Sequence, residues 1–477
     1  MSETEHGRMV RVPEAPRRGG GLEGYFGITE RGSTVRTEIA AGVTTWLTMA
    51  YILFVNPSIL GAVKDSQGVS LTFPEVLTVT ALVAGVMTLA MGVYGRYPFA
   101  LAAGLGLNAF VAFSLVGTLG LTWPQAMGVI VAEGILITIF VLTGLRELIL
   151  NAIPMDLKRA IGIGIGLFIA FIGLVNAGVV VQAKPGPVPP VTIVADFRSW
   201  SLALFVFGLF LTSALVARRV KGALLIGIVA TTIVATIVNE VKHLGVFTDG
   251  SAAWPGFSNL TASPNFSLVG KFSFGFFSSL GFWTAAAIVI SVMLSDFFDT
   301  IGTVIGIGGE AKMLDADGRL PGIKRVLLVD SLAAVAGGAA SASSNTTYIE
   351  SASGVSQGGR TGLTSVVVGI LFLLCMFFSP IAGIVPSVAT APILVIVGYY
   401  MMTLVKDIEW GDPGIGIPVL LTIALMPFTY SITNGVGAGF LSYTVIAVVR
   451  GRAREVHPLM YLVSAIFAWY FIHGVVG

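Results

Sequence analysis

Five acidic residues stand inside long apolar runs of this chain. They are Glu133, Asp296, Asp299, Asp330 and Glu350, and no Lys or Arg lies at comparable depth in those runs. An ionised carboxylate at the centre of a membrane-spanning helix costs about 2.5 to 3.5 kcal/mol. Such a group of acids must therefore be neutralised, hydrogen-bonded or used, and it indicates a binding site or a path for protons.

Asp296 and Asp299 form the closest pair of these acids. They are three residues apart in LSDFFDTIGTVIG and share one helix face, which Thr300 and Thr303 extend by a turn. Two like charges so placed favour the uptake of a proton by one of them, and a carboxylate that takes up a proton is what a proton-coupled carrier requires. The alternative is that both acids only bind backbone groups freed by neighbouring broken helices.

Glu350 lies in the polar stretch 341–360, SASSNTTYIESASGVSQGGR, which separates two apolar runs. Thr347-Tyr-Ile-Glu350 fits a capping box, in which the glutamate reaches back to the start of its helix. If that helix starts within the membrane, its free N–H groups would hold a polar ligand, and Glu350 is the nearest acceptor for a ligand N–H. Tyr348 and Phe297 flank the acids and are suited either to stacking on a planar ligand or to simple packing.

The remaining polar candidates have weaker patterns. Asn108 occupies the corresponding place in the first half of the chain, where its amide can bind a ligand or cap a helix. We interpret Glu133 as a structural partner. Asp330 follows Arg325 by little more than a helical turn, which favours an ion pair near the membrane interface.

The amino-acid composition indicates which class of protein contains these acids. The chain has 477 residues, 55% hydrophobic and 11% charged, whereas soluble domains are about 25% charged. We therefore expect an all-α polytopic membrane protein. The single cysteine, Cys375, excludes a disulfide framework. Residues 1–37 are polar and predict a disordered cytoplasmic tail.

Apolar runs predict fourteen transmembrane segments, and a fifteenth apolar segment, 457–475, either spans the membrane or lies along its surface. The fourteen are 38–60, 74–95, 98–118, 122–144, 159–178, 200–218, 221–240, 282–305, 324–340, 341–359, 361–384, 390–405, 413–429 and 432–450.

The distribution of basic residues supports this count. With a cytoplasmic N-terminus, all but five of the 27 Lys and Arg residues fall on the cytoplasmic side, as the positive-inside rule requires. Without a crossing at 341–360, the second half of the chain would lose this bias. The five exceptions are Lys64, Lys184, Arg198, Lys242 and Lys271.

Two crossings have an interrupted pattern, and they predict an internal repeat. In one, Pro98 opens an extended run that leads through Gly104 into a helix; in the other, a strand at 343–347 precedes a short helix. Asn108 and Glu350 are 242 residues apart, and the span starts at 38 and 282 are 244 apart. We expect two inverted seven-helix repeats, with a strand plus half-helix at segments 3 and 10, enclosed by protein near a midplane binding site.

At these residues the chain resembles the nucleobase-ascorbate transporter superfamily, and within it the azaguanine-like purine permease branch. The matching pieces are TTWLTMAYILFVNP (44–57), GLGLNAF (104–110), SDFFDTIGT (295–303) and NTTYIESASG (345–354). The resemblance implies a core domain and a gate domain, with proton-driven uptake of adenine, guanine or hypoxanthine. The implied divisions are 38–144 and 282–384 for the core and 145–240 and 390–450 for the gate. We further expect an extracytoplasmic loop at 241–281 and a C-terminal segment at 451–477, which lies beyond the resemblance.

The resemblance also implies roles for individual residues. Glu350 matches the glutamate of segment 10 that binds the edge of the base, and Asp296 matches the acid of segment 8 that contacts the base. Asn108 matches the segment 3 residue of the branch, and Asp299 matches the second acid of segment 8. Uracil-type members have a histidine where this chain has Thr300, a difference that fits the purine branch and argues against a proton relay through histidine.

We therefore expect a secondary active transporter of the cell (inner) membrane, not an enzyme, whose partners are a purine nucleobase, a proton and the lipid bilayer. No cofactor, metal or nucleic acid is expected, and homodimerisation is left open. One alternative is an intramembrane enzyme that holds metal-diphosphate between Asp296 and Asp299; another is an anion carrier of related fold. The expected substrate-binding residues are Glu350, Asp296, Asn108, Tyr348, Ile349 and Phe297, and those for proton coupling are Asp296, Asp299 and Glu350.

Overall fold

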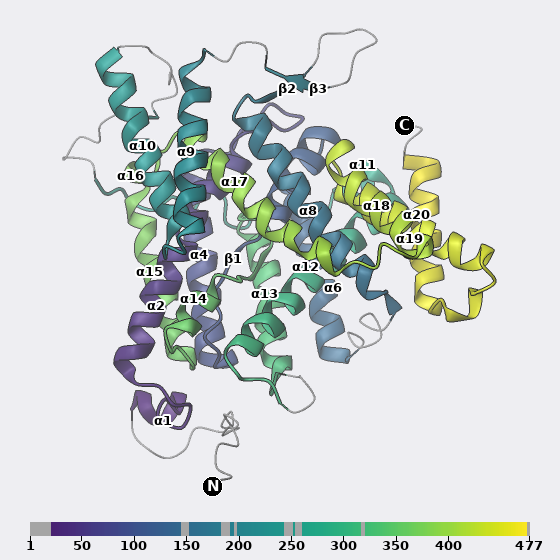
Figure 1. The fold of residues 1–477 in the computed structure, drawn as a ribbon, viewed down its shortest axis with the longest axis horizontal. Helices are drawn as coiled ribbons and strands as arrows, with labels where there is room; N and C mark the ends of the chain where they lie inside the picture. Colours follow the sequence, from purple (N-terminus) through teal and green to yellow (C-terminus); the bar gives the residue numbers. More distant parts are fainter. Residues whose placement is uncertain are drawn as a thin grey trace.

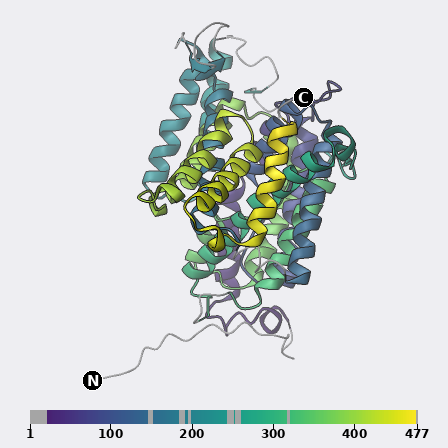
Figure 2. The ribbon, with the colours of Figure 1, turned by 90° about the vertical axis from the view of Figure 1, so that its right-hand side faces the viewer.

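The computed structural model describes residues 21–144, 152–182, 191–194, 198–242, 251–252, 260–315 and 320–474. These residues form an α-helical polytopic membrane protein in which ten helices are long and apolar enough to cross a bilayer. The helices form one stack, with α1 (Leu22–Phe26) at one end and the β2–β3 sheet at the other (Figure 1). Seen from the side, α20 stands upright on the outside of the stack (Figure 2).

The first half of the chain contains nine helices in its described residues, together with three strands and two π-helical segments. They are α1 (Leu22–Phe26), α2 (Val35–Met49), α3 (Ile52–Leu60), α4 (Phe73–Ala90), η1 (Met91–Gly95), β1 (Leu101–Ala103), α5 (Leu105–Ala109), η2 (Phe110–Thr118), α6 (Trp123–Thr143), α8 (Met155–Asn176), β2 (Val180–Gln182), β3 (Val191–Ile193), α9 (Trp200–Ala217) and α10 (Ala223–Lys242).

The second half repeats the pattern of long helices around a short strand. Its elements are α11 (Phe276–Leu280), α12 (Phe282–Glu310), α13 (Ile323–Ala339), β4 (Asn345–Thr347), α14 (Ser351–Ser356), α15 (Gly362–Cys375), η4 (Met376–Phe378), α16 (Ser379–Ala382), α17 (Ser387–Met402), η5 (Thr403–Asp407), α18 (Pro413–Phe428), α19 (Ile432–Val449), η6 (Ala453–Glu455) and α20 (Pro458–Gly474).

Ten of the fourteen predicted segments correspond to the long apolar helices. The other four are formed by shorter elements: β1 with α5 and η2, α13, β4 with α14, and α18. The predicted strand and helix order of both interrupted segments is confirmed. Each interruption is short because its strand is only three residues long.

Residues 21–37 differ from the expected disordered tail. They form α1 and the start of α2, and the Arg31 side chain is buried. Its guanidinium donates hydrogen bonds to the backbone oxygens of Arg96 (2.7 Å) and Arg360 (3.0 Å) and lies over the ring of Tyr97. These contacts hold the segment against the bundle, so the prediction was wrong for residues 21–37; residues 1–20 lie outside the described part of the chain.

The break between α2 and α3 positions the buried side chain of Tyr51. Pro57 lies inside α3 and has no N–H to donate to the preceding turn. The chain turns at Ala50 and Tyr51 between the two helices. Tyr51 therefore projects from an interruption in the bundle, where it is buried.

Candidate functional site

The two interrupted segments meet in the interior of the protein. Strand β1 pairs antiparallel with β4, with Leu101 opposite Thr347 and Ala103 opposite Asn345. All six strand residues are buried. The polar stretch is thus enclosed by protein, as predicted, because an extended backbone at membrane depth needs internal hydrogen-bond partners.

Asp330 fixes β4 in place. One of its carboxylate oxygens accepts hydrogen bonds from the backbone N–H (2.8 Å) and the hydroxyl (2.7 Å) of Thr347, and the other accepts from the Thr300 hydroxyl (2.6 Å). The prediction of an interface ion pair with Arg325 was therefore wrong. Asp330 joins α12, α13 and β4 because it faces inward on α13.

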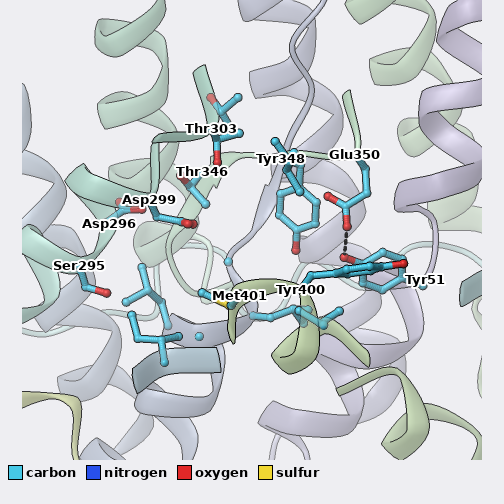
Figure 3. Close-up of a pocket in the computed structure, with 18 residues that line it drawn as sticks. Tyr51, Ser295, Asp296, Asp299, Thr303, Thr346, Tyr348, Glu350, Tyr400 and Met401 are labelled. Atoms are coloured by element: carbon cyan, nitrogen blue, oxygen red, sulfur yellow. Dashed lines mark hydrogen bonds between the residues drawn. The ribbon is translucent and has the colours of Figure 1, made fainter. Parts of the chain in front are cut away.

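A cavity of about 120 Å³ lies between β4, the start of α5 and the middle of α12. Figure 3 shows Glu350 on one side of this cavity, Asp296 and Asp299 on the other, and Tyr348 between them. Pockets for drug-sized ligands hold about 300 Å³ or more, so this cavity suits a small molecule. The lining residues are Tyr51, Gly104, Leu105, Gly106, Leu107, Ile165, Ser295, Asp296, Asp299, Thr303, Thr346, Thr347, Tyr348, Ile349, Glu350, Val397, Tyr400 and Met401.

The two acids of α12 have different surroundings. Asp296 is buried, and one of its oxygens accepts a hydrogen bond from the Ser344 hydroxyl (3.0 Å), while the other has no partner among the described residues. Asp299 is exposed to the cavity. One acid is thus anchored by the polar stretch, and the other is available to whatever occupies the cavity.

Glu350 does not cap its helix. It stands at the N-cap position of α14, but its side chain makes no capping hydrogen bond. Its carboxylate instead accepts a hydrogen bond from the Tyr51 hydroxyl (2.6 Å). The capping box was therefore a wrong prediction, since the helix starts one turn later than that pattern requires.

The other predicted binding residues divide into two groups. Tyr348 and Ile349 line the cavity, and the Tyr348 hydroxyl donates to the backbone oxygen of Ala103. Asn108 and Phe297 do not line it. Asn108 lies inside α5, whose N-cap is Gly104, so its predicted alternative as a cap was wrong. Phe297 is 2% exposed and belongs to the hydrophobic core, which favours packing over stacking on a ligand.

The sequence profile of the xanthine/uracil permeases, described as Permease family, matches residues 36–450. The chain belongs to this permease family. The resemblance found in the sequence is thereby confirmed, and the protein is a transporter rather than an enzyme.

Named relatives are similar to the permease over nearly its whole length. Adenine permease AdeQ of Escherichia coli is 39% identical over 450 residues, covering 94% of this chain and 96% of that protein. Guanine/hypoxanthine permease PbuG of Bacillus subtilis is 38% identical over 454 residues, covering 94% and 99%. The transmembrane domain of a cyanobacterium bicarbonate transporter, BicA, shares the fold, with a TM-score of 0.55 and 14% identity over 87% of this chain and 96% of that one.

A second cavity of the permease, of about 580 Å³, adjoins the first. Ile349, Glu350 and Tyr400 line both cavities. The second cavity is also lined by Arg219 and Lys221, in the turn between α9 and α10. These three shared residues therefore lie between the central cavity and the second cavity, which reaches the basic turn.

Sequence reasoning missed Tyr51 and Tyr400 as residues of the cavity. Tyr51 lies in a stretch that supports the family resemblance, and the only local signal for a distorted helix is Pro57, six residues later, which lies inside α3. Tyr400 lies at the end of α17, in an apolar run with no polar pattern. Both are placed by helix packing, which short sequence motifs do not report.

Proposed function

We propose that this permease is a proton-coupled secondary transporter that imports purine nucleobases, namely adenine, guanine or hypoxanthine, across the cell membrane. The observation that carries the proposal is the placement of Glu350 opposite Asp296 and Asp299 across a small cavity. All three purines offer ring N–H donors, adenine and guanine also offer exocyclic N–H donors, and carboxylates are strong acceptors for these groups. The names of AdeQ and PbuG support a purine cargo.

In this proposal the residues of the cavity have different roles. Glu350 binds the edge of the base, held in position by Tyr51. Asp296 contacts the base from α12, and Tyr348 and Ile349 border it. Protonation of Asp296, Asp299 or Glu350 accompanies binding. Asn108 supports α5 from behind the cavity wall, and Phe297 supports α12 through the core.

The proposed fold has fourteen crossings in two inverted seven-helix repeats, with a cytoplasmic N-terminus. Antiparallel pairing of β1 with β4 supports the inversion, since the two strands occupy corresponding places in the two halves. Close packing of α6 with α13, and of α15 with α2 and α4, supports a core domain of 38–144 and 282–384. Packing of α8 with α17 and α18 supports a gate domain of 145–240 and 390–450.

Alternating access then requires the core to move against the gate. The basic turn at Arg219 and Lys221 belongs to the predicted cytoplasmic face. The second cavity adjoins that turn, so it is the proposed exit to the cytoplasm. Ile349 and Tyr400 would open that exit as α17 moves away from α14.

An anion cargo fits this cavity less well. Three carboxylates lie in its lining, and no Lys, Arg or His is among those lining residues. An anion would meet charges of its own sign at close range in a medium of low dielectric constant. The shared fold with a bicarbonate transporter concerns architecture alone.

Uptake of radiolabelled purines into cells tests the proposal. Glu350→Gln and Asp296→Asn should abolish uptake of adenine, guanine and hypoxanthine while the protein stays in the membrane. Glu409→Gln is the matched control, since Glu409 is exposed between α17 and α18. Competition with unlabelled adenine, guanine, hypoxanthine, xanthine and uracil identifies the preferred base. Wild-type uptake by both site variants would refute the site, and uptake that is undiminished after the pH gradient is collapsed would refute proton coupling.

A further inference from the structure

A buried carboxyl group lies behind the cavity, outside its lining. Glu133 on α6 is 0% exposed, and neither of its carboxyl oxygens has a hydrogen-bond partner among the described residues. A buried polar group without partners is costly, and a purely structural acid would be bonded as Asp330 is. The interpretation of Glu133 as a structural partner therefore leaves both of its oxygens unexplained.

The groups that face Glu133 come from three neighbouring elements. Helix α6 packs against α13, which carries Asp330, and against α12, which carries Asp296, and the Ser344 side chain lies beside Glu133. The Ser344 hydroxyl is also the donor to Asp296. Asp330 already accepts three hydrogen bonds, whereas Asp296 retains one oxygen without a partner.

The helices that carry these carboxyl groups supply no basic residue at their depth, and on the neighbouring α8 the ammonium of Lys158 lies over the ring of Phe298. Helices α6 and α12 contain no Lys or Arg, and those of α13 are confined to its first turn, at Lys324 and Arg325. Adjacent carboxylates in an apolar interior cannot all be ionised without a counter-charge. A mobile proton would neutralise one of these carboxylates, and the oxygens without hydrogen-bond partners are the atoms that would bind it.

We propose that Glu133 is a holding site for the coupling proton, which it exchanges with Asp296 through the Ser344 hydroxyl. This rests on the proposed function of the permease as a proton-coupled transporter. In the exchange, the carboxyl O–H of Glu133 passes its proton to the Ser344 oxygen, and the hydroxyl proton of Ser344 passes to the Asp296 carboxylate. Glu133 becomes ionised and Asp296 neutral, so atoms and total charge are conserved.

The arrangement separates proton storage from substrate contact. Asp296 lines the cavity and Glu133 does not. A proton on Glu133 is thus shielded from the cavity by α12 and the polar stretch, and it leaves only when Asp296 accepts it. Substrate binding changes the proton affinity of Asp296. Occupancy of the cavity is thereby coupled to the protonation state of Glu133.

Glu133→Gln in proteoliposomes tests this role. Glutamine keeps the shape of a protonated glutamate but cannot release a proton. We expect exchange of internal for external labelled purine within about twofold of wild type, and a loss of about tenfold or more in accumulation driven by a pH gradient. Wild-type accumulation by Glu133→Gln would overturn the proposal. Glu409→Gln is the matched control and should retain both activities.

Two further variants keep the test decisive if Glu133→Gln is not found in the membrane. Ser344→Ala removes the bridging hydroxyl and should lower gradient-driven accumulation by a larger factor than exchange, which also falls because Asp296 loses its donor. Glu133→Asp keeps an ionisable group and should recover part of the accumulation. Accumulation by Ser344→Ala at the wild-type level would overturn the proposal. Failure of the wild-type protein to respond to a pH gradient would instead refute the proposed function.

Discussion

The hydroxyl of Tyr51 donates a 2.6 Å hydrogen bond to the carboxylate of Glu350. This bond joins the break between α2 and α3 to the start of α14. Both residues line the central cavity. Tyr51 therefore fixes one oxygen of Glu350 at the edge of the cavity.

Tyr51→Phe should weaken substrate binding while it preserves the fold. The phenylalanine fills the same buried space but leaves Glu350 without its donor, and a hydrogen bond to a charged group contributes about 1.5 kcal/mol or more. We expect the KM for purine uptake to rise about tenfold, with a smaller change in maximal rate. The measurement is the concentration dependence of initial uptake.

Tyr461→Phe is the control for that substitution. The Tyr461 hydroxyl donates to the backbone oxygen of Ala453 at the exposed start of α20, away from the cavity. Its KM should match wild type. An unchanged KM for Tyr51→Phe would show that Glu350 needs no orientation by Tyr51.

Asp330→Ala should lower the thermal stability of the protein. The change leaves the buried backbone N–H of Thr347 without its acceptor and frees the hydroxyls of Thr300 and Thr347. Such losses cost about 3 kcal/mol. Thermal unfolding in detergent should show a clearly lower midpoint, whereas the exposed Asp407→Ala should unfold like wild type. Equal midpoints for both variants would mean that Asp330 does not anchor β4.

Gly337→Ala tests how closely α13 approaches the polar stretch. A Cβ at this position would meet the backbone oxygen of Ser343 and would lie 2.7 Å from the side-chain nitrogen of Asn345. Because Ser343 already has a left-handed backbone (φ 70°), the turn into β4 has little freedom to move aside. We expect lower thermal stability and loss of uptake.

Gly302→Ala is the matched helix control for stability. A Cβ at Gly302 on α12 would meet nothing within 4 Å, and alanine is favoured over glycine within a helix. Its thermal midpoint should equal or exceed that of wild type. If the two alanine variants unfolded alike, the close approach at Gly337 would have no energetic consequence.

The sequence predicts the framework of the site better than its contacts. Apolar runs predict helices because the bilayer demands satisfied backbones, and the polar stretch predicts an internal strand for the same reason. The bond between Tyr51 and Glu350 joins residues 299 positions apart. It depends on the rotation of α2 and α3 at their break, which no local pattern specifies.

Local patterns also misled where a tertiary partner competed. The motif at Thr347 and Glu350 satisfies the capping rule, yet Thr347 is engaged by Asp330 and Glu350 by Tyr51. Proximity in sequence similarly suggested Arg325 for Asp330. In both cases the side chain faces the protein interior, and its partner is whichever group tertiary packing brings to that face.

Helix α20 should cross the membrane and place the C-terminus on the face opposite the N-terminus. Its 17 residues extend about 26 Å. Tyr470, late in α20, donates to Asn434, early in α19 (2.9 Å), and Ser464 bonds to Thr444 (2.8 Å). Pairing of late with early residues means that α20 runs antiparallel to α19.

Reporter fusions that are active on only one side of the membrane measure this topology. A fusion directly after Glu455 precedes α20, and a fusion after Gly477 follows it. The two should report opposite faces, with the first cytoplasmic because Arg450, Arg452 and Arg454 cluster there. Reporters on the same face would mean that α20 does not span the membrane, and the contacts with α19 would then have to form without a crossing.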